Sequence, residues 1–393
     1  MNFFVLSVLK AAVVAAVLLT TLAYLQWVER KVIAHIQLRM GPSRVGPHGL
    51  LQPLADVLKL LTKEDLLPAH VHRFLYLLAP FLAVSLALTA IAVIPFGPEI
   101  EVFGVRTAMG LADLNIAVLF LLALSSIGVY AIALAGWASN NKYALLGGLR
   151  SAAQMISYEL PMALAIVAPL LLANTLSLRD IADRQAGSIL NWSILQLPAP
   201  QLLGFLIFAI AGFAETNRIP FDLPEAENEL VAGFHTEYSS MKFACFFMAE
   251  YANMITISCL AALLFLGGWH PLFPSAMGSD FVPAVVLLAA AGIALYHGLN
   301  PARPKDRVTL PAAALVFAAA ALLFLVPVLR PVLVPVFWFA AKVGTLLFVF
   351  IWVRGTLPRF RYDQLMRFAW LILFPVAMAN LLATGLLVAL FAK

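Results

Sequence analysis

The chain has 393 residues, of which 63% are hydrophobic and only 11% are charged, and its formal net charge is +5. So low a charged fraction excludes a water-soluble globular protein. Long apolar runs without charges recur along the whole chain, and a helix needs about 20 apolar residues to cross the hydrocarbon core of a membrane. The positive net charge therefore indicates membrane topology and not nucleic-acid binding.

Ten apolar segments are predicted as transmembrane helices. In chain order they lie near residues 3–28, 74–95, 112–136, 151–174, 200–215, 243–266, 281–298, 310–329, 333–353 and 368–391. The predicted fold class is an all-α polytopic integral membrane protein with about ten transmembrane helices. We expect a single transmembrane domain over residues 1–393.

The basic residues predict the orientation of these helices. The loops on one side, which are 29–73, 137–150, 216–242, 299–309 and 354–367, hold 18 of the 25 Lys and Arg residues. Because Lys and Arg accumulate in cytoplasmic loops, we expect these five loops to be cytoplasmic. An even number of spans then places both termini on the opposite, periplasmic side.

The first loop contains a predicted amphipathic surface helix. Gly-Pro pairs at residues 41–42 and 46–47 exclude a regular helix in the first part of the loop. After Pro53 the sequence LADVLKLL follows, and its apolar side chains share one helical face: Leu54, Val57, Leu58 and Leu61. This helix is too short to span, so we expect it along the membrane surface or against a partner.

Residues 214–238, AETNRIPFDLPEAENELVAGFHTEY, form an acidic segment between two apolar runs. They hold six of the chain's twenty carboxylates: Glu215, Asp222, Glu225, Glu227, Glu229 and Glu237. Pro220 interrupts a helix here, and Asp222 can cap a new short helix with Glu225 three residues later. A solvated acidic loop would explain these two acids. It explains Glu215 poorly, because that residue closes a long apolar run.

Three ionisable residues lie within other predicted spans, namely Glu159, Glu250 and Lys342. Ionisable groups inside a membrane are costly and usually line a polar path. One of them alone could be explained by helix packing. Together with the acidic segment they predict a proton relay.

Other features predict no bound metal or redox cofactor. His70 and His72 have no third metal ligand at a suitable spacing and are interpreted as loop histidines. Cys245 and Cys259 share one apolar run and are interpreted as buried free thiols. We find no phosphate loop, nucleophile elbow or dinucleotide fingerprint. We therefore expect no metal, flavin or iron–sulfur cluster in this chain.

Three segments resemble one family. They are ERKVIAHIQLRMGPSRVGPHGLLQPLADVLKLLTKED, AETNRIPFDLPEAENELVAGFHTEYSSMKFACFFMAEY and WVRGTLPRFRYDQLM. They are similar to signature segments of the NuoH-type subunit (NADH dehydrogenase subunit 1 family) of respiratory complex I, the proton-translocating NADH:quinone oxidoreductase. The resemblance implies an enzyme subunit that forms the membrane-side part of the quinone-binding cavity. It also implies coupling of quinone reduction to proton translocation.

The resemblance implies roles for individual residues. Those of the quinone cavity, in loops 29–73 and 216–242, would be Glu29, Arg30, Arg39, Asp56, Arg218 and Asp222. Those of proton coupling would be Glu159, Glu215, Glu225, Glu227, Glu229 and Glu250. A topology anchor is the alternative interpretation of Arg30.

The same resemblance implies a substrate, partners and a location. Ubiquinone or menaquinone would be the substrate. The partners would be other complex I membrane subunits, the hydrophilic quinone-module subunits that carry the terminal iron–sulfur cluster, and the lipid bilayer, with no nucleic acid. The location would be a bacterial inner (cytoplasmic) membrane.

The chain departs from the family pattern at residues 281–329. The family typically has about eight spans, so these residues would form an inserted helical hairpin. We expect it at the lipid-facing periphery, away from the quinone site. Several prolines leave a re-entrant or surface-lying pair of helices as the alternative: Pro283, Pro301, Pro304 and Pro311.

Other functions would fit parts of the sequence. The equivalent subunit of a membrane-bound hydrogenase, or of a ferredoxin- or F420-dependent complex, would share the subunit type but receive electrons from another donor. A proton-coupled secondary transporter would use intramembrane acids, but it predicts internal repeats that this chain does not show. A structural membrane anchor leaves Glu159 and Glu250 unexplained.

Overall fold

The computed structural model describes residues 3–102, 105–222, 231–301 and 306–391. Among these residues, nine helices are long and apolar enough to cross a membrane, and α7 (Leu202–Glu215) is a shorter apolar helix. They correspond one for one to the ten predicted spans. The predicted all-α polytopic membrane fold is confirmed.

The elements follow in chain order. The long helices are α1 (Phe3–Ile36), α3 (Arg73–Ala92), α4 (Ala117–Ala138), α5 (Lys142–Ala173), α9 (Ser240–Phe265), α10 (Val282–Leu299), α11 (Asp306–Leu325), α12 (Arg330–Thr356) and α14 (Phe374–Phe391), the last continued from α13 (Tyr362–Arg367) through the π-helical η6 (Phe368–Leu373). The shorter elements are α2 (Gln52–Thr62), α6 (Leu178–Arg184), strands β1 (Gly97–Val102) and β2 (Val105–Met109), and the 3₁₀ turns η1 (Pro47–Gly49), η2 (Ile189–Asn191), η3 (Gly233–His235), η4 (Ser275–Met277) and η5 (Ser279–Phe281).

Two predicted loops are shorter than the sequence indicated. Helix α1 continues to Ile36, so Glu29 and Arg30 lie on its last turns and not in a loop. Helix α5 begins at Lys142, where the side chain of Asn141 caps it by accepting a hydrogen bond from the Tyr143 amide at 2.9 Å. Charged residues at these helix ends made the apolar runs look shorter than the helices are.

The β1–β2 hairpin was not predicted from the sequence. Its antiparallel strands follow α3, and Lys10 of α1 donates a hydrogen bond to the carbonyl of Ala108 at 2.7 Å. The apolar period of the flanking spans gives no sign of so short a pair of strands. Its role in the fold is to anchor the start of α1.

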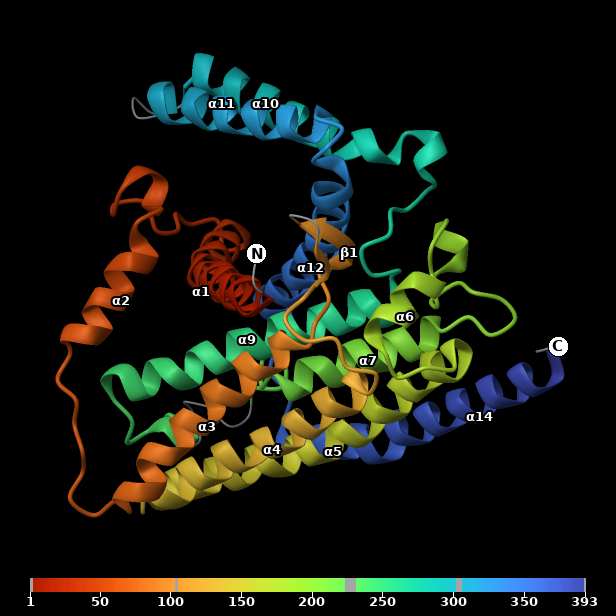
Figure 1. Ribbon diagram of the computed structural model, residues 1–393. Coiled ribbons are helices and arrows are strands. Elements are labelled where there is room, and N and C mark those ends of the chain that lie inside the picture. Colours follow the sequence, from red (N-terminus) through yellow and green to blue (C-terminus); the bar gives the residue numbers. More distant parts are fainter. Residues whose placement is uncertain (1–2, 103–104, 223–230, 302–305, 392–393) are drawn as a thin grey trace.

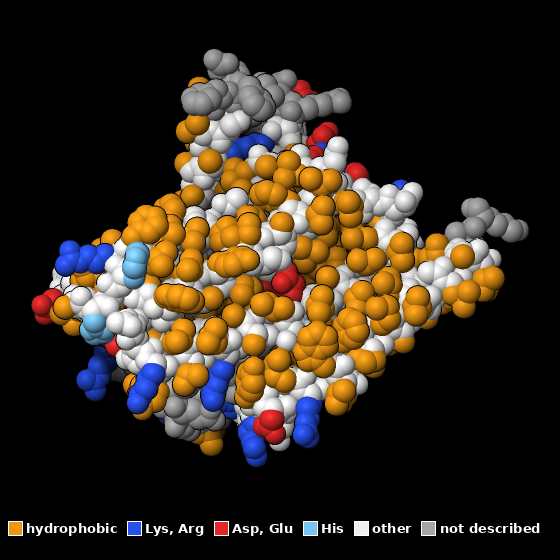
Figure 2. Space-filling model, turned by 90° about the horizontal axis from the view of Figure 1, so that it is seen from below, with side chains coloured by type: hydrophobic (Ala, Val, Ile, Leu, Met, Phe, Trp, Pro, Cys, Tyr) orange, Lys and Arg blue, Asp and Glu red, His pale blue; other side chains and the backbone are white. Residues whose placement is uncertain are grey.

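Helix α9 lies at the centre of the molecule (Figure 1). It packs against α3, α12, α2, α6 and α7, and most of its residues are buried. Helices α3, α4, α5 and α14 lie side by side along one flank. Figure 2 shows that hydrophobic side chains cover most of the face seen from below, as a lipid-contacting surface requires.

The predicted amphipathic helix is α2, and its apolar face is open. Leu54 and Leu61 are each 57% exposed. On the other face Asp56 accepts a hydrogen bond from Arg30 of α1 at 2.8 Å, which joins the two helices. An open apolar face on a short helix fits a position at the membrane surface.

The region 281–329 contains α10 and α11, which pack against each other. Small side chains are buried seven residues apart, at Ala284, Ala291 and Gly298 on α10 and at Ala314 and Ala321 on α11. A Cβ atom on Gly298 would lie 2.6 Å from Pro311 Cδ, so the two backbones approach closely there. Small residues allow such contact between membrane helices, where no hydrophobic force drives association.

Candidate functional site

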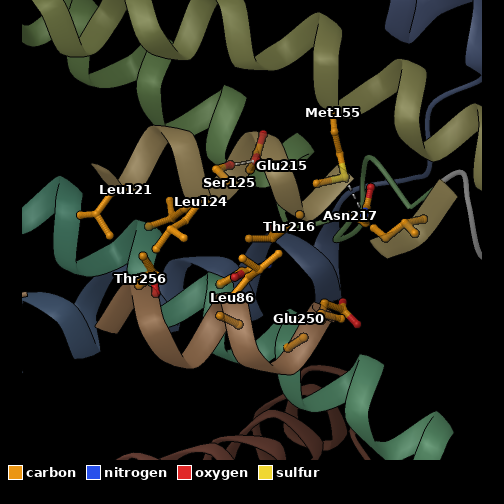
Figure 3. A pocket seen from close by; sticks show the side chains of 18 of the residues that line it. Leu86, Leu121, Leu124, Ser125, Met155, Glu215, Thr216, Asn217, Glu250 and Thr256 are labelled. Atoms are coloured by element: carbon orange, nitrogen blue, oxygen red, sulfur yellow. Dashed lines mark hydrogen bonds between the residues drawn. The ribbon is translucent and has the colours of Figure 1, made fainter. Parts of the chain in front are cut away.

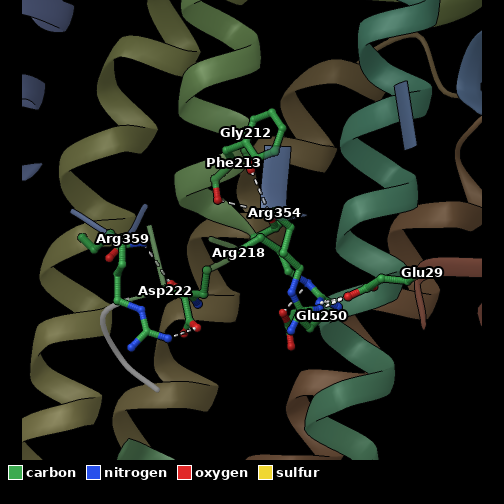
Figure 4. Close-up of polar contacts among 11 residues, drawn as sticks. Glu29, Gly212, Phe213, Arg218, Asp222, Glu250, Arg354 and Arg359 are labelled. Carbon is green, nitrogen blue, oxygen red and sulfur yellow. Dashed lines mark hydrogen bonds and ion pairs between the residues drawn. The ribbon is translucent and has the colours of Figure 1, made fainter. Parts of the chain in front are cut away.

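A buried network of charges joins α1, α9, α12 and the turn after α7 (Figure 4). Arg218 Nε lies 2.6 Å from Glu250 Oε1, and Arg218 Nη1 lies 3.3 Å from Glu29 Oε1. Arg354 also donates a hydrogen bond to Glu29. Glu29 and Arg218 are each only 4% exposed. Because water does not solvate these charges, each depends on its partners.

A second ion pair lies beside this network. Arg359 Nη2 lies 3.0 Å from Asp222 Oδ2, and Asp222 is 8% exposed. The guanidinium of Arg218 also stacks 4.2 Å from the centre of the Tyr251 ring. Three arginines thus face three carboxylates in these pairs: Arg218, Arg354 and Arg359 against Glu29, Asp222 and Glu250. One added or removed charge would disturb this balance strongly.

A cavity of about 100 Å³ lies next to the network (Figure 3). Glu215 and Glu250 both line it, together with Asn217, Ser125 and mostly apolar side chains. A water molecule needs roughly 10–15 Å³ of such space, so the cavity is large enough for several. The cavity thus offers space for water beside both acids.

Two neighbouring serines of α4 each bind one acid. Ser125 donates a hydrogen bond to Glu215, and Ser126 donates one to Glu159. Glu215 is 6% exposed, whereas Glu159 is half-buried on α5. Two serine–acid pairs thus lie on neighbouring residues of α4, one at the cavity and one at the exposed side of the helix.

Gln154 fixes the backbone that carries this site. Its Nε2 donates hydrogen bonds to the carbonyls of Ala214 and Phe221, both at 2.8 Å, and the residue is fully buried. These two carbonyls bracket the turn between Glu215 and Asp222. A side chain on α5 thus sets the distance between the cavity acid and the ion-pair network.

The remaining predicted site residues lie apart from the network or outside the described residues. Arg30 and Asp56 form their own pair between α1 and α2, and the Arg30 side chain is 44% exposed. Arg39 is exposed and donates a hydrogen bond to Gln37 at 2.7 Å. The acids that lie outside the described residues are Glu225, Glu227 and Glu229.

An aromatic cluster lies at η3 and at the start of α9. His235 is buried among the rings of Phe234, Phe243 and Phe247. This burial lowers the pKa of His235 to about 4, so the imidazole is neutral near neutral pH. The neutral imidazole of His235 thus packs against aromatic rings in the segment just before α9.

Lys342, which the sequence placed among the residues of a relay, contacts backbone carbonyls in the structure. Its ammonium donates hydrogen bonds to the carbonyls of Leu266, Gly268 and His270 at 2.6, 2.9 and 2.7 Å, and it lies 4.1 Å from the centre of the Trp192 ring. All three protons of an ammonium are thereby used. Lys342 of α12 instead fixes the chain that leaves the end of α9.

Replacing Lys342 by methionine is expected to lower thermal stability and to leave turnover at low temperature near the wild-type value. Methionine keeps an unbranched side chain but leaves three buried or partly buried carbonyls without their donor. The measurement is the temperature at which the purified assembly loses activity, beside turnover before heating. A collapse of turnover with unchanged thermal stability would restore the relay interpretation.

Several site residues escaped the sequence interpretation. Arg354 and Arg359 lie in a segment whose four arginines and one aspartate needed acidic partners, and that excess was the available signal. Ser125 and Ser126 form the pair SS inside an apolar run, but serines also bond their own helix backbone, so the sequence alone does not single them out. In the part of the chain that the structure describes, no three His, Cys, Asp or Glu side chains converge as metal ligands.

Comparisons with known proteins agree on one family. A sequence model of the family described as NADH dehydrogenase matches residues 9–385. The chain is 67% identical over 388 residues to the NADH-quinone oxidoreductase H subunit numbered 1 in Solibacter usitatus, with 99% of this chain and 98% of the relative covered. It is 48% identical over 398 residues to the second such protein of Koribacter versatilis, with 99% and 98% covered. It is 44% identical over 401 residues to the first such protein of Geobacter sulfurreducens, with 99% and 97% covered.

Proposed function

The chain belongs to the NADH dehydrogenase family as a subunit of NADH-quinone oxidoreductase, and from this premise we propose that it forms the membrane-side part of the quinone cavity and couples quinone reduction to proton translocation. The observation that carries the proposal is the buried charge network beside a cavity lined by Glu215 and Glu250. A solely structural membrane helix bundle has no use for such a network of paired charges in its interior.

The network provides a physical means of coupling. Quinone reduction takes up two electrons and two protons, and negative charge develops on the headgroup before the protons arrive. A negative charge near Arg218 would compete with Glu250 for this arginine, because Coulomb forces are strong where water is excluded. Glu250 would then bind a proton. Water in the cavity would pass protons between Glu250 and Glu215.

The surroundings of Glu159, at the outer end of the proposed path, favour contact with another membrane subunit. Glu159 is half-buried, and Ser126, which binds it, is exposed on α4 next to the exposed Ile127. A carboxylate at this depth is costly to leave against lipid. We propose that a membrane subunit of the complex covers it, and that hydrophilic quinone-module subunits cover the loops on the cytoplasmic side.

The proposal is tested on the intact assembly purified through a tag on this chain. We expect NADH-oxidising subunits to copurify and NADH to reduce a quinone, and we expect a quinone-site inhibitor to stop the reaction. An assembly that evolves hydrogen or oxidises ferredoxin or reduced F420, but does not oxidise NADH, would contradict the NADH-dependent assignment. Ion-coupled solute uptake by the chain alone would support the transporter alternative.

Replacing Ser125 by alanine is expected to slow quinone reduction about 10-fold, because Glu215 loses a hydrogen bond of the size typical for a charged acceptor. Threonine at the same position keeps the hydroxyl and should recover most of the rate. The measurement is the steady-state rate in assembled complex of equal subunit content. Equal rates for the alanine and threonine variants would show that the hydroxyl group does not determine the rate of quinone reduction.

A further inference from the structure

The α10–α11 hairpin contacts the first loop, and the sequence did not predict this contact. The Nε2 atom of His48 lies 3.0 Å from Thr309 Oγ1 and 3.3 Å from Asp306 Oδ1. His48 belongs to η1, between α1 and α2, whereas Asp306 and Thr309 lie in the first turns of α11. In Figure 1 the turn before α2 lies next to the end of the hairpin.

Local features show that this contact constrains both partners. The side chain of Asp306 is only 13% exposed, and that of His48 is 33% exposed. The backbone of His48 is left-handed, with φ 51°, a conformation that non-glycine residues adopt rarely and that surrounding contacts must hold. Asp306 is also placed favourably, since an acid in the first helical turn interacts well with the helix dipole.

The loop that His48 holds is tightly built and leads into α2. A Cβ atom on Gly49 would lie 2.4 Å from the carbonyl oxygen of Pro42, and the Leu51 amide donates a hydrogen bond to the Val45 carbonyl at 3.3 Å. Helix α2 begins at the next residue and pairs with α1 through Asp56 and Arg30. Because the loop is tight, a fixed His48 fixes the start of α2.

The other contacts of the hairpin lead to α12. Beyond their mutual packing, the main contacts of α10 and α11 in the described part of the chain are with η5, just before α10, and with α12, which follows α11. Helix α12 carries Arg354, the partner of Glu29 on α1. The hairpin therefore contacts both α12 and the first loop.

We propose that the α10–α11 hairpin is a brace that holds the first loop through His48 and thereby sets the gap between α1 and α2. Its effect on catalysis rests on the proposed function, and it takes the further premise that quinone enters the cavity from the bilayer beside these two helices. The brace gives the insertion a role in substrate entry. The contact through His48 joins the hairpin to the first loop, and the expectation that the hairpin lies away from the quinone site stays a prediction.

The test uses the whole complex with His48→Asn or Asp306→Ala. Asparagine tolerates the left-handed backbone but is too short to keep both contacts, so it removes the side-chain contact without adding strain. Arg307→Gln is the matched control, because Arg307 is exposed on the same turn of α11. Thr309→Val is a milder variant that serves if Asp306→Ala fails to assemble.

The first readout is hydrogen exchange of residues 41–51. We expect exchange to be about 5- to 10-fold faster in each single variant, which is the size typical for losing one hydrogen bond. The double variant, His48→Asn with Asp306→Ala, should show no further increase, because both substitutions break the same contact. The control Arg307→Gln should show no change. Unchanged exchange in both single variants would overturn the brace. Hydrogen exchange can be measured whether or not the complex reduces quinone. The brace and the proposed function are therefore tested independently.

The second readout separates entry from chemistry. We expect the apparent KM for a long-chain quinone to rise severalfold in His48→Asn and in Asp306→Ala, while kcat stays within about twofold, because entry and not the buried network is disturbed. Faster exchange with an unchanged KM would overturn the role in substrate entry. A fall in kcat with an unchanged KM would also overturn the role in substrate entry.

Discussion

Complex carrying Arg218→Gln is expected to lose quinone reduction and to assemble in reduced yield. Arg218 is the partner of Glu250 at 2.6 Å and a second partner of Glu29, and all three side chains are largely buried. Removing one member of a buried ion pair typically costs about 3–5 kcal/mol, because the remaining charge is left without solvent or partner. The measurements are quinone reduction per complex and the yield of intact complex.

A second substitution identifies the cause of this loss. Arg218→Gln combined with Glu250→Gln removes one charge of each sign, and Glu29 keeps Arg354. We expect assembly to recover while turnover stays low, since Glu250 is the proton acceptor in the proposed coupling. A wild-type yield for Arg218→Gln alone would show that the network contributes little to the fold.

Replacing Glu215 by glutamine is expected to lower quinone reduction by at least about 10-fold without loss of assembly. Glutamine keeps the shape of the side chain and can still accept a hydrogen bond from Ser125. It cannot bind and release a proton, so the proposed proton path between Glu250 and Glu159 would be interrupted. The measurement is turnover normalised to the amount of assembled complex.

Glu101→Gln is the matched control for this variant. Glu101 is exposed on β1 of the β1–β2 hairpin, and its replacement makes the same change of charge away from the cavity. We expect it to behave as wild type. If Glu215→Gln and Glu101→Gln have equal turnover, Glu215 has no part in proton transfer.

Most of the fold could be predicted because lipid imposes a simple rule on the sequence. Every spanning segment must satisfy its own backbone hydrogen bonds and expose apolar side chains, so uncharged apolar runs mark the helices. The ends were less predictable. Helices α1 and α5 extend past the apolar runs through Glu29 and Lys142, where tertiary partners or solvent satisfy the charges.

The site could be predicted only in part, because function depends on which charges meet. The sequence indicated that Glu215 and Glu250 are unusual, and the family resemblance implied a role for Arg218. Neither indicated that Arg354, more than 300 residues from Glu29, is the ion-pair partner of Glu29. For Lys342 the structure shows contacts that the sequence did not predict. Its position within a span predicted a relay, whereas three backbone carbonyls satisfy its ammonium.

The most direct test of the coupling role compares two rates in liposomes that contain either wild-type complex or Glu215→Gln. NADH-driven quinone reduction and acidification of the lumen are recorded together in the same sample. If proton uptake at Glu215 is an obligatory step of turnover, both rates fall by the same factor and their ratio is unchanged. Quinone reduction at the wild-type rate in Glu215→Gln would contradict this account.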